Sequence, residues 1–198
     1  MSTSDWIRVR QIFGSAILAG ICIGLGGIAY LSVGCLEGAV LFAFGLATIL
    51  KYGFWLYTGK ANDVCSLRDV AILFLVVLVG NVMGCGISSL FSSADIVDSA
   101  REVVASHIDR GAACNFLYAV PCGIIMTAAV GCYRRGSVIP MLLGVPVFIM
   151  CGYVHSVADA FYYITAREFT LEALECWAVA VAGNFIGCNL FRMIHTVL

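Results

Sequence analysis

Long apolar runs alternate with short polar joints along the whole chain of 198 residues. A helix needs about 20 residues to cross the hydrocarbon core of a bilayer. Six runs reach roughly that length, and they are 12–33, 38–57, 70–91, 111–133, 138–164 and 171–194. The pattern therefore predicts an all-α membrane protein with six transmembrane helices, forming a single domain over 1–198.

The longest polar joint, 92–110, has a helical periodicity of its own. Its apolar residues Val97, Ala100, Val104 and Ile108 recur at spacings of three and four, so they fall on one face of a helix. A helix with one apolar and one polar face lies along a membrane surface rather than across it. We therefore predict an amphipathic connector at 92–110.

Composition agrees with this class of protein. Hydrophobic residues form 62% of the chain and charged residues 12%, whereas soluble domains are about 45–50% apolar and about 25% charged. A net charge of −1 gives no sign of a nucleic-acid partner. The ten cysteines lie mostly in apolar runs, with no C-x-x-C pair and no zinc or iron–sulfur spacing. We expect them to behave as small hydrophobes, and we expect no metal and no cofactor.

Basic residues favour one orientation, because cytoplasmic loops of membrane proteins are enriched in Lys and Arg. If the N-terminus is inside, the cytoplasmic segments carry Arg8, Arg10, Lys60, Arg68, Arg134, Arg135 and Arg192. The opposite segments then carry Arg101, Arg110 and Arg167. We predict a multi-pass protein of the cell inner (plasma) membrane with both termini cytoplasmic, which requires an even number of spans.

A short string, G-N-x-x-G-C, occurs at 80–85 and again at 183–188, 103 residues later. The copies fall in the third and sixth runs, so they divide the chain into halves at about 12–91 and 111–195. Halves with three spans each have opposite orientations, which predicts an inverted repeat of the kind found in transporters. The alternative is a simple G-x-x-x-G packing face. We assign to helix packing Gly80, Asn81, Gly84, Gly183, Asn184 and Gly187.

Three ionisable residues lie at membrane depth, namely Lys51, His155 and Asp159. Such residues are costly in a bilayer, so they usually face a pore or a partner. Loss of water favours a neutral imidazole at His155, while an arriving anion favours imidazolium or a shared proton. A small acid could then pass an apolar constriction as a neutral species. The alternative is a hydrogen-bonded histidine that only packs.

Several strings resemble those of the formate/nitrite transporter family of pentameric anion channels. Residues 56–59 (LYTG) resemble the family's L-F-T-G, and residues 152–159 (GYVHSVAD) resemble its G-F-E-H-S-x-A-N. Residues 114–117 (CNFL) resemble its C-N-x-L, and the two G-N-x-x-G strings match its third and sixth helices. The resemblance implies an aquaporin-like homopentamer whose second and fifth helices are broken, with one pore in each protomer.

The resemblance also implies roles for particular residues. His155 matches the central pore histidine, and Thr58 matches the threonine that faces it. Leu56 and Phe148 match apolar constriction residues on one side of that histidine. The remaining implied pore residues are Phe42 and Leu46, which are further constriction positions, and Asn115, which helps to tie the pore segments.

The chain departs from the family pattern around these strings. Trp55, Lys60, Val154 and Asp159 stand where the family has an acidic residue, Asn, Glu and Asn, and Lys51 has no counterpart. We interpret Lys51 or Lys60 as the source of a positive field that attracts anions, with Asp159 paired to one of them. The alternative is that Lys60 is an ordinary flanking residue and that Lys51 snorkels to the interface.

These features favour a channel or transporter for a small monovalent anion, such as formate, nitrite or hydrosulfide, with proton sharing at His155. We expect no catalytic residues and no enzyme activity. One alternative is a neutral small-solute pore of the aquaporin-like type. The other is a membrane-embedded redox subunit, but a bis-histidine haem needs two facing histidines. His107 and His195 lie at run ends, which we expect to be far from the level of His155.

Overall fold

The computed structural model describes residues 3–195, and every regular element in that range is helical. The all-α prediction is therefore confirmed. The elements are α1 (Thr3–Val33), α2 (Cys35–Tyr52), α3 (Tyr57–Lys60), the 3₁₀ turn η1 (Ala61–Asp63), α4 (Leu67–Ile72), the π-helical stretch η2 (Leu73–Leu78), α5 (Val79–Ser89), α6 (Ala94–Arg110), α7 (Ala112–Arg134), α8 (Ile139–Met150), α9 (Ser156–Ala166) and α10 (Leu171–His195).

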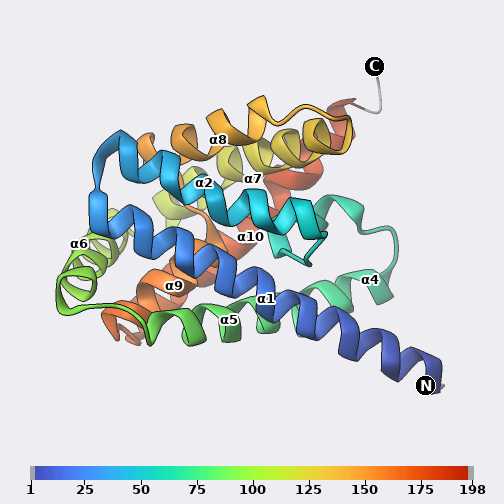
Figure 1. Ribbon diagram of the computed structural model, residues 1–198, viewed down its shortest axis with the longest axis horizontal. Helices are drawn as coiled ribbons and strands as arrows, with labels where there is room; N and C mark the ends of the chain where they lie inside the picture. The colour runs from blue at the N-terminus through green and yellow to red at the C-terminus, as the bar shows by residue number, and fades with distance from the viewer. Residues whose placement is uncertain (1–2, 196–198) are drawn as a thin grey trace.

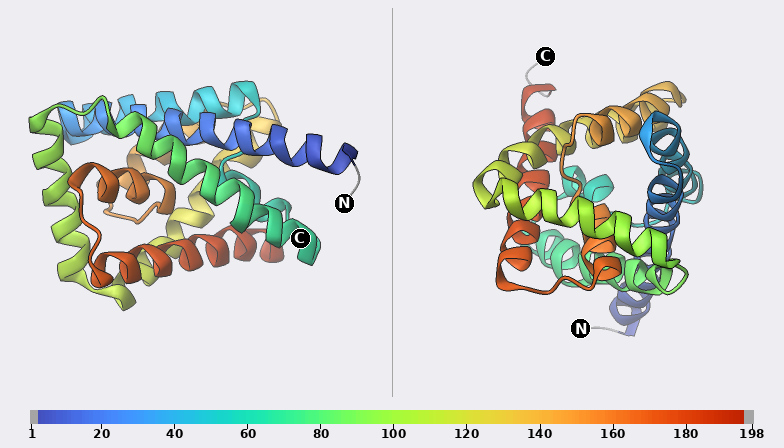
Figure 2. Two further views of the ribbon diagram at one scale, coloured as in Figure 1. Left: turned by 90° about the horizontal axis from the view of Figure 1, so that it is seen from below. Right: turned by 90° about the vertical axis from the view of Figure 1, so that its left-hand side faces the viewer.

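The longer helices form a bundle whose members run roughly along the long axis of the molecule (Figure 1). Helix α1 packs on α2 and α5, and helix α7 packs on α10 and α8. Helix α6 lies across one end of this bundle, nearly perpendicular to its neighbours (Figure 2). The predicted helix in the connector is confirmed, and its buried face consists of Ile96, Ala100, Val104 and His107.

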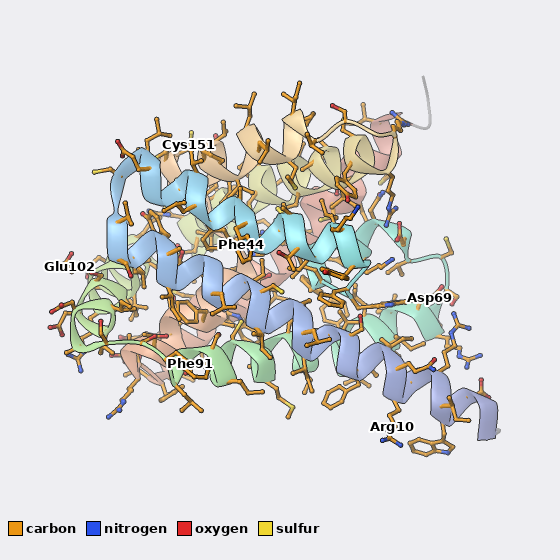
Figure 3. The ribbon with its side chains drawn as sticks, in the orientation of Figure 1. Arg10, Phe44, Asp69, Phe91, Glu102 and Cys151 are labelled. Atoms are coloured by element: carbon orange, nitrogen blue, oxygen red, sulfur yellow. The ribbon has the colours of Figure 1, made fainter. Side chains whose placement is uncertain are left out.

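Five helices of the described chain are long and apolar enough to cross a membrane: Asp5–Val33, Cys35–Tyr52, Leu67–Ser89, Ala112–Arg134 and Leu171–Leu190. The fifth predicted run, 138–164, is divided between α8 and α9, with 151–155 between them. Many large apolar side chains also face outward from the single chain, Phe44 and Phe91 among them (Figure 3). The protein is a multi-pass membrane protein.

The second predicted run, 38–57, ends early because α2 stops at Tyr52. Gly53 has the left-handed φ of 70°, which glycine adopts without a side-chain clash. The N–H of Phe54 donates to the carbonyl of Ile49, and the chain then extends to Leu56 before α3 begins. This helix break, which we call the first break, covers 53–56.

The end of α8 has the same construction. Gly152 has a φ of 67°, and the N–H of Tyr153 donates to the carbonyl of Phe148. The chain then extends to His155, and α9 begins at Ser156. This second break, 151–155, leaves backbone groups without helical partners in the middle of the bundle.

The repeated glycines lie where helices make close contact. A Cβ atom on Gly84 would overlap the carbonyl oxygen of Ile17 on α1, and one on Gly187 would overlap that of Val120 on α7. Gly80 and Gly183 face the methyl groups of Ala16 and Ala119 in the same way. Because backbone cannot move aside as a flexible side chain can, these contacts require glycine.

Candidate functional site

Asn81 on α5 satisfies the backbone of the first break. Its Oδ1 accepts a hydrogen bond of 2.8 Å from the N–H of Tyr57. Its Nδ2 donates to the carbonyl of Trp55 at 2.9 Å and to the carbonyl of Ala16 at 2.8 Å. A buried backbone group without a partner costs about 1–3 kcal/mol, so this side chain stabilises the interruption directly.

Asn184 on α10 makes the equivalent bonds at the second break. Its Oδ1 accepts from the N–H of Ser156 at 2.8 Å. Its Nδ2 donates to the carbonyl of Val154 at 2.9 Å and to that of Ala119 at 2.8 Å. Sequence reasoning placed both asparagines among packing residues and missed this contact with the breaks. The available signal was a polar amide repeated at the same place in two apolar runs.

Two cysteines contact the helix that follows the break in the opposite half of the chain. The thiol of Cys188 donates to the carbonyl of Thr58 at 3.4 Å, and that of Cys85 donates to the carbonyl of Val157 at 3.3 Å. The thiol of Cys188 also donates to the carbonyl of Gly123 on α7 at 3.4 Å, and that of Cys85 donates to the carbonyl of Gly20 on α1 at 3.5 Å. The two breaks are therefore held from both halves of the sequence.

Thr58 and His155 meet between the two breaks. Oγ1 of Thr58 lies 3.0 Å from Nε2 of His155, and both residues are buried. Nδ1 of His155 accepts a hydrogen bond of 3.1 Å from the N–H of Ala158 in the first turn of α9. Because Nδ1 is an acceptor, a neutral ring carries its proton on Nε2 and donates it to Thr58.

Aromatic rings cover His155 on one side. The ring of Phe148 stacks on the imidazole with centroids 5.5 Å apart, and Phe42 meets Phe148 edge-on at 6.0 Å. All three side chains are buried. Phe42 comes from α2 and Phe148 from α8, so two helices close this side of the histidine.

Two cavities lie at different levels of the bundle. The first, called the α6 cavity, has a volume of about 310 Å³. Its lining includes Tyr30, Glu102, His107, Arg110, Phe148, His155, Asp159 and Tyr162. The second, called the α3 cavity, has a volume of about 360 Å³, and its lining includes Leu46, Ile49, Leu56, Gly59, Lys60, Val130 and Arg134.

The cavities correct one prediction about the constriction. Leu56 and Phe148 were expected on one side of His155, but Phe148 lines the α6 cavity and Leu56 lines the α3 cavity with Leu46. The reason is that Leu56 belongs to the first break, which follows the C-terminal end of α2, whereas Phe148 lies in the last turn of α8, before the second break.

The charged residues also differ from expectation. Asp159 does not pair with a lysine: its Oδ2 lies 3.3 Å from Nδ1 of His107 on α6. Lys51 is exposed. Nζ of Lys60 lies 3.5 Å from Asp63 and 4.8 Å from the centroid of the Trp55 ring. Both lysines belong to the opposite end of the bundle from α6, which is why neither reaches Asp159.

His107 was expected far from the level of His155, and this expectation is wrong. Both histidines line the α6 cavity, because α6 folds over the end of the bundle and turns the side chain of His107 inward. The side chain of His195 lies outside the described part of the chain, as does that of Arg192. Asn115 lies close by, and its Nδ2 donates to the carbonyl of His107 at 2.6 Å, so it ties α7 to α6 rather than to a break.

An ion pair lies beside the α3 cavity. Arg134 at the end of α7 makes two hydrogen bonds to the carboxylate of Asp63, at 2.7 and 2.9 Å. Burial favours a higher pKa for Asp63, but the hydrogen bonds and charge of Arg134, with a contribution from Lys60, lower its pKa below the ordinary value. Asp69, on the same end of the bundle (Figure 3), accepts a hydrogen bond of 2.8 Å from the hydroxyl of Ser66.

The site thus consists of two helix breaks, the buried pair of Thr58 and His155, and a cavity at each level. The sequence profile described as formate/nitrite transporter matches residues 5–197. The chain belongs to the formate/nitrite transporter family. Comparison with curated protein sequences gives no match.

Solved structures of formate/nitrite transporter proteins share the fold. A structure described as a pentameric formate channel with formate bound superposes with a TM-score of 0.82 at 20% identity, covering 96% of each chain. One described as an FNT family ion channel gives a TM-score of 0.80 at 20% identity, covering 94% of this chain and 89% of the other. At this identity the likeness establishes the fold.

Proposed function

We propose that the protein moves a small monovalent anion, of the formate, nitrite or hydrosulfide class, through each protomer by a path that joins the α6 cavity to the α3 cavity. The observation that carries this proposal is the buried pair of Thr58 and His155, 3.0 Å apart between residues of the two cavities. Membership of the formate/nitrite transporter family supports the same function.

The path requires a particular architecture, which is part of the proposal. Helices α8 and α9 together make one crossing, so that the chain has six spans in two inverted halves. The matched hydrogen bonds of Asn81 and Asn184 support this symmetry. The similar pentameric channel supports a homopentamer. We place both termini in the cytoplasm and the protein in the plasma membrane, because of the distribution of basic residues.

The chemistry of passage follows from the state of His155. An anion that enters between Phe42 and Phe148 loses water, and a buried charge without partners costs several kcal/mol. The N–H on Nε2, which donates to Thr58 in this structure, is then available to the anion as a hydrogen-bond donor. When His155 has taken up a second proton from solution, transfer of the Nε2 proton to the anion leaves a neutral imidazole and forms a neutral acid, which crosses Leu46 and Leu56.

Flux through the purified protein in liposomes tests this function. We expect formate flux well above that of protein-free vesicles, with a dependence on pH between about 5 and about 8, the range in which histidine titrates. His155→Ala should remove this dependence while the oligomer, measured by gel filtration, stays intact. A His155→Ala protein with the wild-type pH profile would contradict the proposed role of the histidine.

A neutral-solute pore is the second candidate, and one observation favours it. Asp159 lines the α6 cavity, and a carboxylate there repels an entering anion. Swelling of the same vesicles in glycerol or urea separates the two functions. Swelling by the neutral solute without formate flux would favour the second candidate over the first.

A further inference from the structure

The pair formed by His107 and Asp159 has no part in the passage step described above. His107 comes from α6 and Asp159 from α9, and Nδ1 and Oδ2 lie 3.3 Å apart. Both side chains are almost enclosed, with 11% of His107 and 3% of Asp159 exposed. Both also line the α6 cavity, which contains His155.

The backbone of His107 is fixed in this position. Its carbonyl accepts hydrogen bonds from Asn115 on α7 at 2.6 Å and from the thiol of Cys176 on α10 at 3.8 Å. The side-chain atom Nδ1 itself has no hydrogen-bond partner within the described residues. An imidazole held firmly beside a carboxylate, with its nearer nitrogen unsatisfied, is suited to exchange a proton with that carboxylate.

The charge of the pair depends on one proton. With one proton the pair is neutral overall, whether it is His⁺ beside Asp⁻ or neutral His beside protonated Asp. Without that proton the pair carries one negative charge. The remaining charged side chains of the cavity balance each other, because Arg110 is positive and Glu102 is negative. The proton on the pair therefore decides whether the α6 cavity is neutral or negative.

The other titratable groups around the pair cannot substitute for that proton at ordinary pH. The helices packed against the pair carry several titratable side chains. They are Tyr30 on α1, Cys85 on α5, Glu102 and Arg110 on α6, Cys122 on α7, His155, Tyr162 and Tyr163 on α9, and Cys176 on α10. Guanidinium stays charged, while phenols and buried thiols stay neutral. Both ring nitrogens of His155 are already hydrogen-bonded, Nε2 to Thr58 and Nδ1 to the N–H of Ala158.

We propose that His107 and Asp159 bind one proton between them, and that this proton sets whether the α6 cavity admits an anion. The inference rests on the proposed anion function and adds a second proton-binding site to the one at His155. As pH rises, the pair loses its proton, the cavity becomes negative and anion entry falls. At an effective dielectric constant near 20, a unit charge changes the occupancy of an anion about 10 Å away from it by about tenfold.

The double variant His107→Gln/Asp159→Asn provides the main test, because it removes both titratable groups and leaves the site of the pair neutral at every pH. Formate flux is measured in liposomes that contain the full-length protein, at matched internal and external pH, after subtraction of flux into protein-free vesicles. We expect the ratio of double-variant to wild-type flux to be near one at about pH 5 and to rise to about tenfold at about pH 8. Effects of His155 are present in both proteins and cancel in the ratio.

His107→Gln gives the opposite sign. It removes the imidazole that holds the proton beside the carboxylate, so the site of the pair is negative wherever Asp159 is ionised. Flux should fall below wild type at about pH 5 to about pH 6 and approach wild type at about pH 8. Asp159→Asn alone leaves an imidazole that can still bind a proton, so its flux should exceed wild-type flux at about pH 5 as well as at about pH 8. A merely structural role would lower flux by the same factor at every pH and would give no rescue.

Asp109→Asn is the matched control, because Asp109 is an exposed carboxylate on α6, the helix that carries His107. It should follow the wild-type profile. If wild-type protein carries formate but the ratio for the double variant His107→Gln/Asp159→Asn is constant with pH, the shared-proton proposal is wrong. If wild-type protein carries no formate at any pH, the proposed function fails instead, so the two failures are distinct.

Discussion

Asn81 and Asn184 make the same three hydrogen bonds to backbone groups, one set at each helix break. Replacement by leucine keeps the volume and removes all three bonds. We expect Asn81→Leu or Asn184→Leu to lower the free energy of unfolding by about 3 kcal/mol, because three buried backbone groups lose a partner. Thermal unfolding of the protein in detergent measures the change.

Asn189→Leu is the control for this prediction. Asn189 also lies on α10, but its longer bond, 3.2 Å, goes to the carbonyl of Ala61, and its other bond goes to Phe185 within the same helix. It should change the melting temperature much less. Equal losses in all three variants would show that Asn81 and Asn184 have no special role at the breaks.

Thr58→Val removes the oxygen that accepts the N–H of His155 while keeping the shape of the side chain. The imidazole nitrogen then lacks a partner in the resting protein, and the anion loses a second polar contact in passage. We expect a fall in formate flux of at least about tenfold, equivalent to the loss of one buried hydrogen bond. Thr58→Ser should recover most of the flux.

The comparison for this variant is Thr48→Val, on the exposed side of α2, where Thr48 bonds to the carbonyl of Phe44 in its own helix. It should leave flux unchanged. Thr58→Val with unchanged flux would contradict a role for the Thr58–His155 bond in passage.

Gly84→Ala and Gly187→Ala should each prevent normal packing. The added methyl group would overlap a backbone oxygen, of Ile17 in one case and of Val120 in the other. Overpacking of this kind costs about 1–3 kcal/mol or more. Gly86→Ala, in the same helix as Gly84 but with open space around the new methyl group, should be neutral or slightly stabilising. Yield of folded oligomer and melting temperature check all three.

The ion pair of Asp63 and Arg134 predicts a pH effect on stability. The pKa of Asp63 is lower in the folded protein than in the unfolded chain, because Arg134 and Lys60 outweigh the effect of burial. The pair therefore stabilises the fold above the unfolded pKa of about 4, and this contribution is lost as pH falls through the lower folded value.

Asp63→Asn removes that contribution. Because the pair is partly exposed, the expected loss at neutral pH is small, about 0.2–1 kcal/mol. The melting temperatures of Asp63→Asn and wild type should differ at pH 7 and converge below about pH 3. A difference that grows on acidification would show that the carboxylate stabilises the fold in another way.

The periodicity of the sequence predicts the helices well because lipid and core contacts both act through apolar side chains. The runs at 12–33 and 171–194 fall within helices of the structure, and the run at 111–133 does so apart from Gly111. The breaks were expected because the strings around Thr58 and His155 resemble those of the family. The glycines alone could not predict them, because glycine is common in unbroken membrane helices. The long transverse helix α6 was readable from its spacing of three and four.

The partners of individual polar residues were not readable. Asp159 and His107 are 52 positions apart, and they meet only because α6 turns its buried face toward α9. Asn81 and Asn184 bind backbone atoms, whose positions depend on where each helix is interrupted rather than on any neighbouring side chain. Opposite charge alone suggested a lysine as the partner of Asp159. The sequence gives the sign of each side chain's charge, but it does not give the end of the bundle at which that side chain lies.

The bond between Ala158 and His155 couples the protonation of the ring to the local helix. Nδ1 can accept from the N–H of Ala158 only while it carries no proton. When the ring becomes imidazolium, two N–H groups face each other, and the first turn of α9 loses the side chain that caps it. A fully charged histidine therefore requires α9 to fray or shift at its start. Isotope-edited infrared spectra of the ring and of the Ala158 amide should change together.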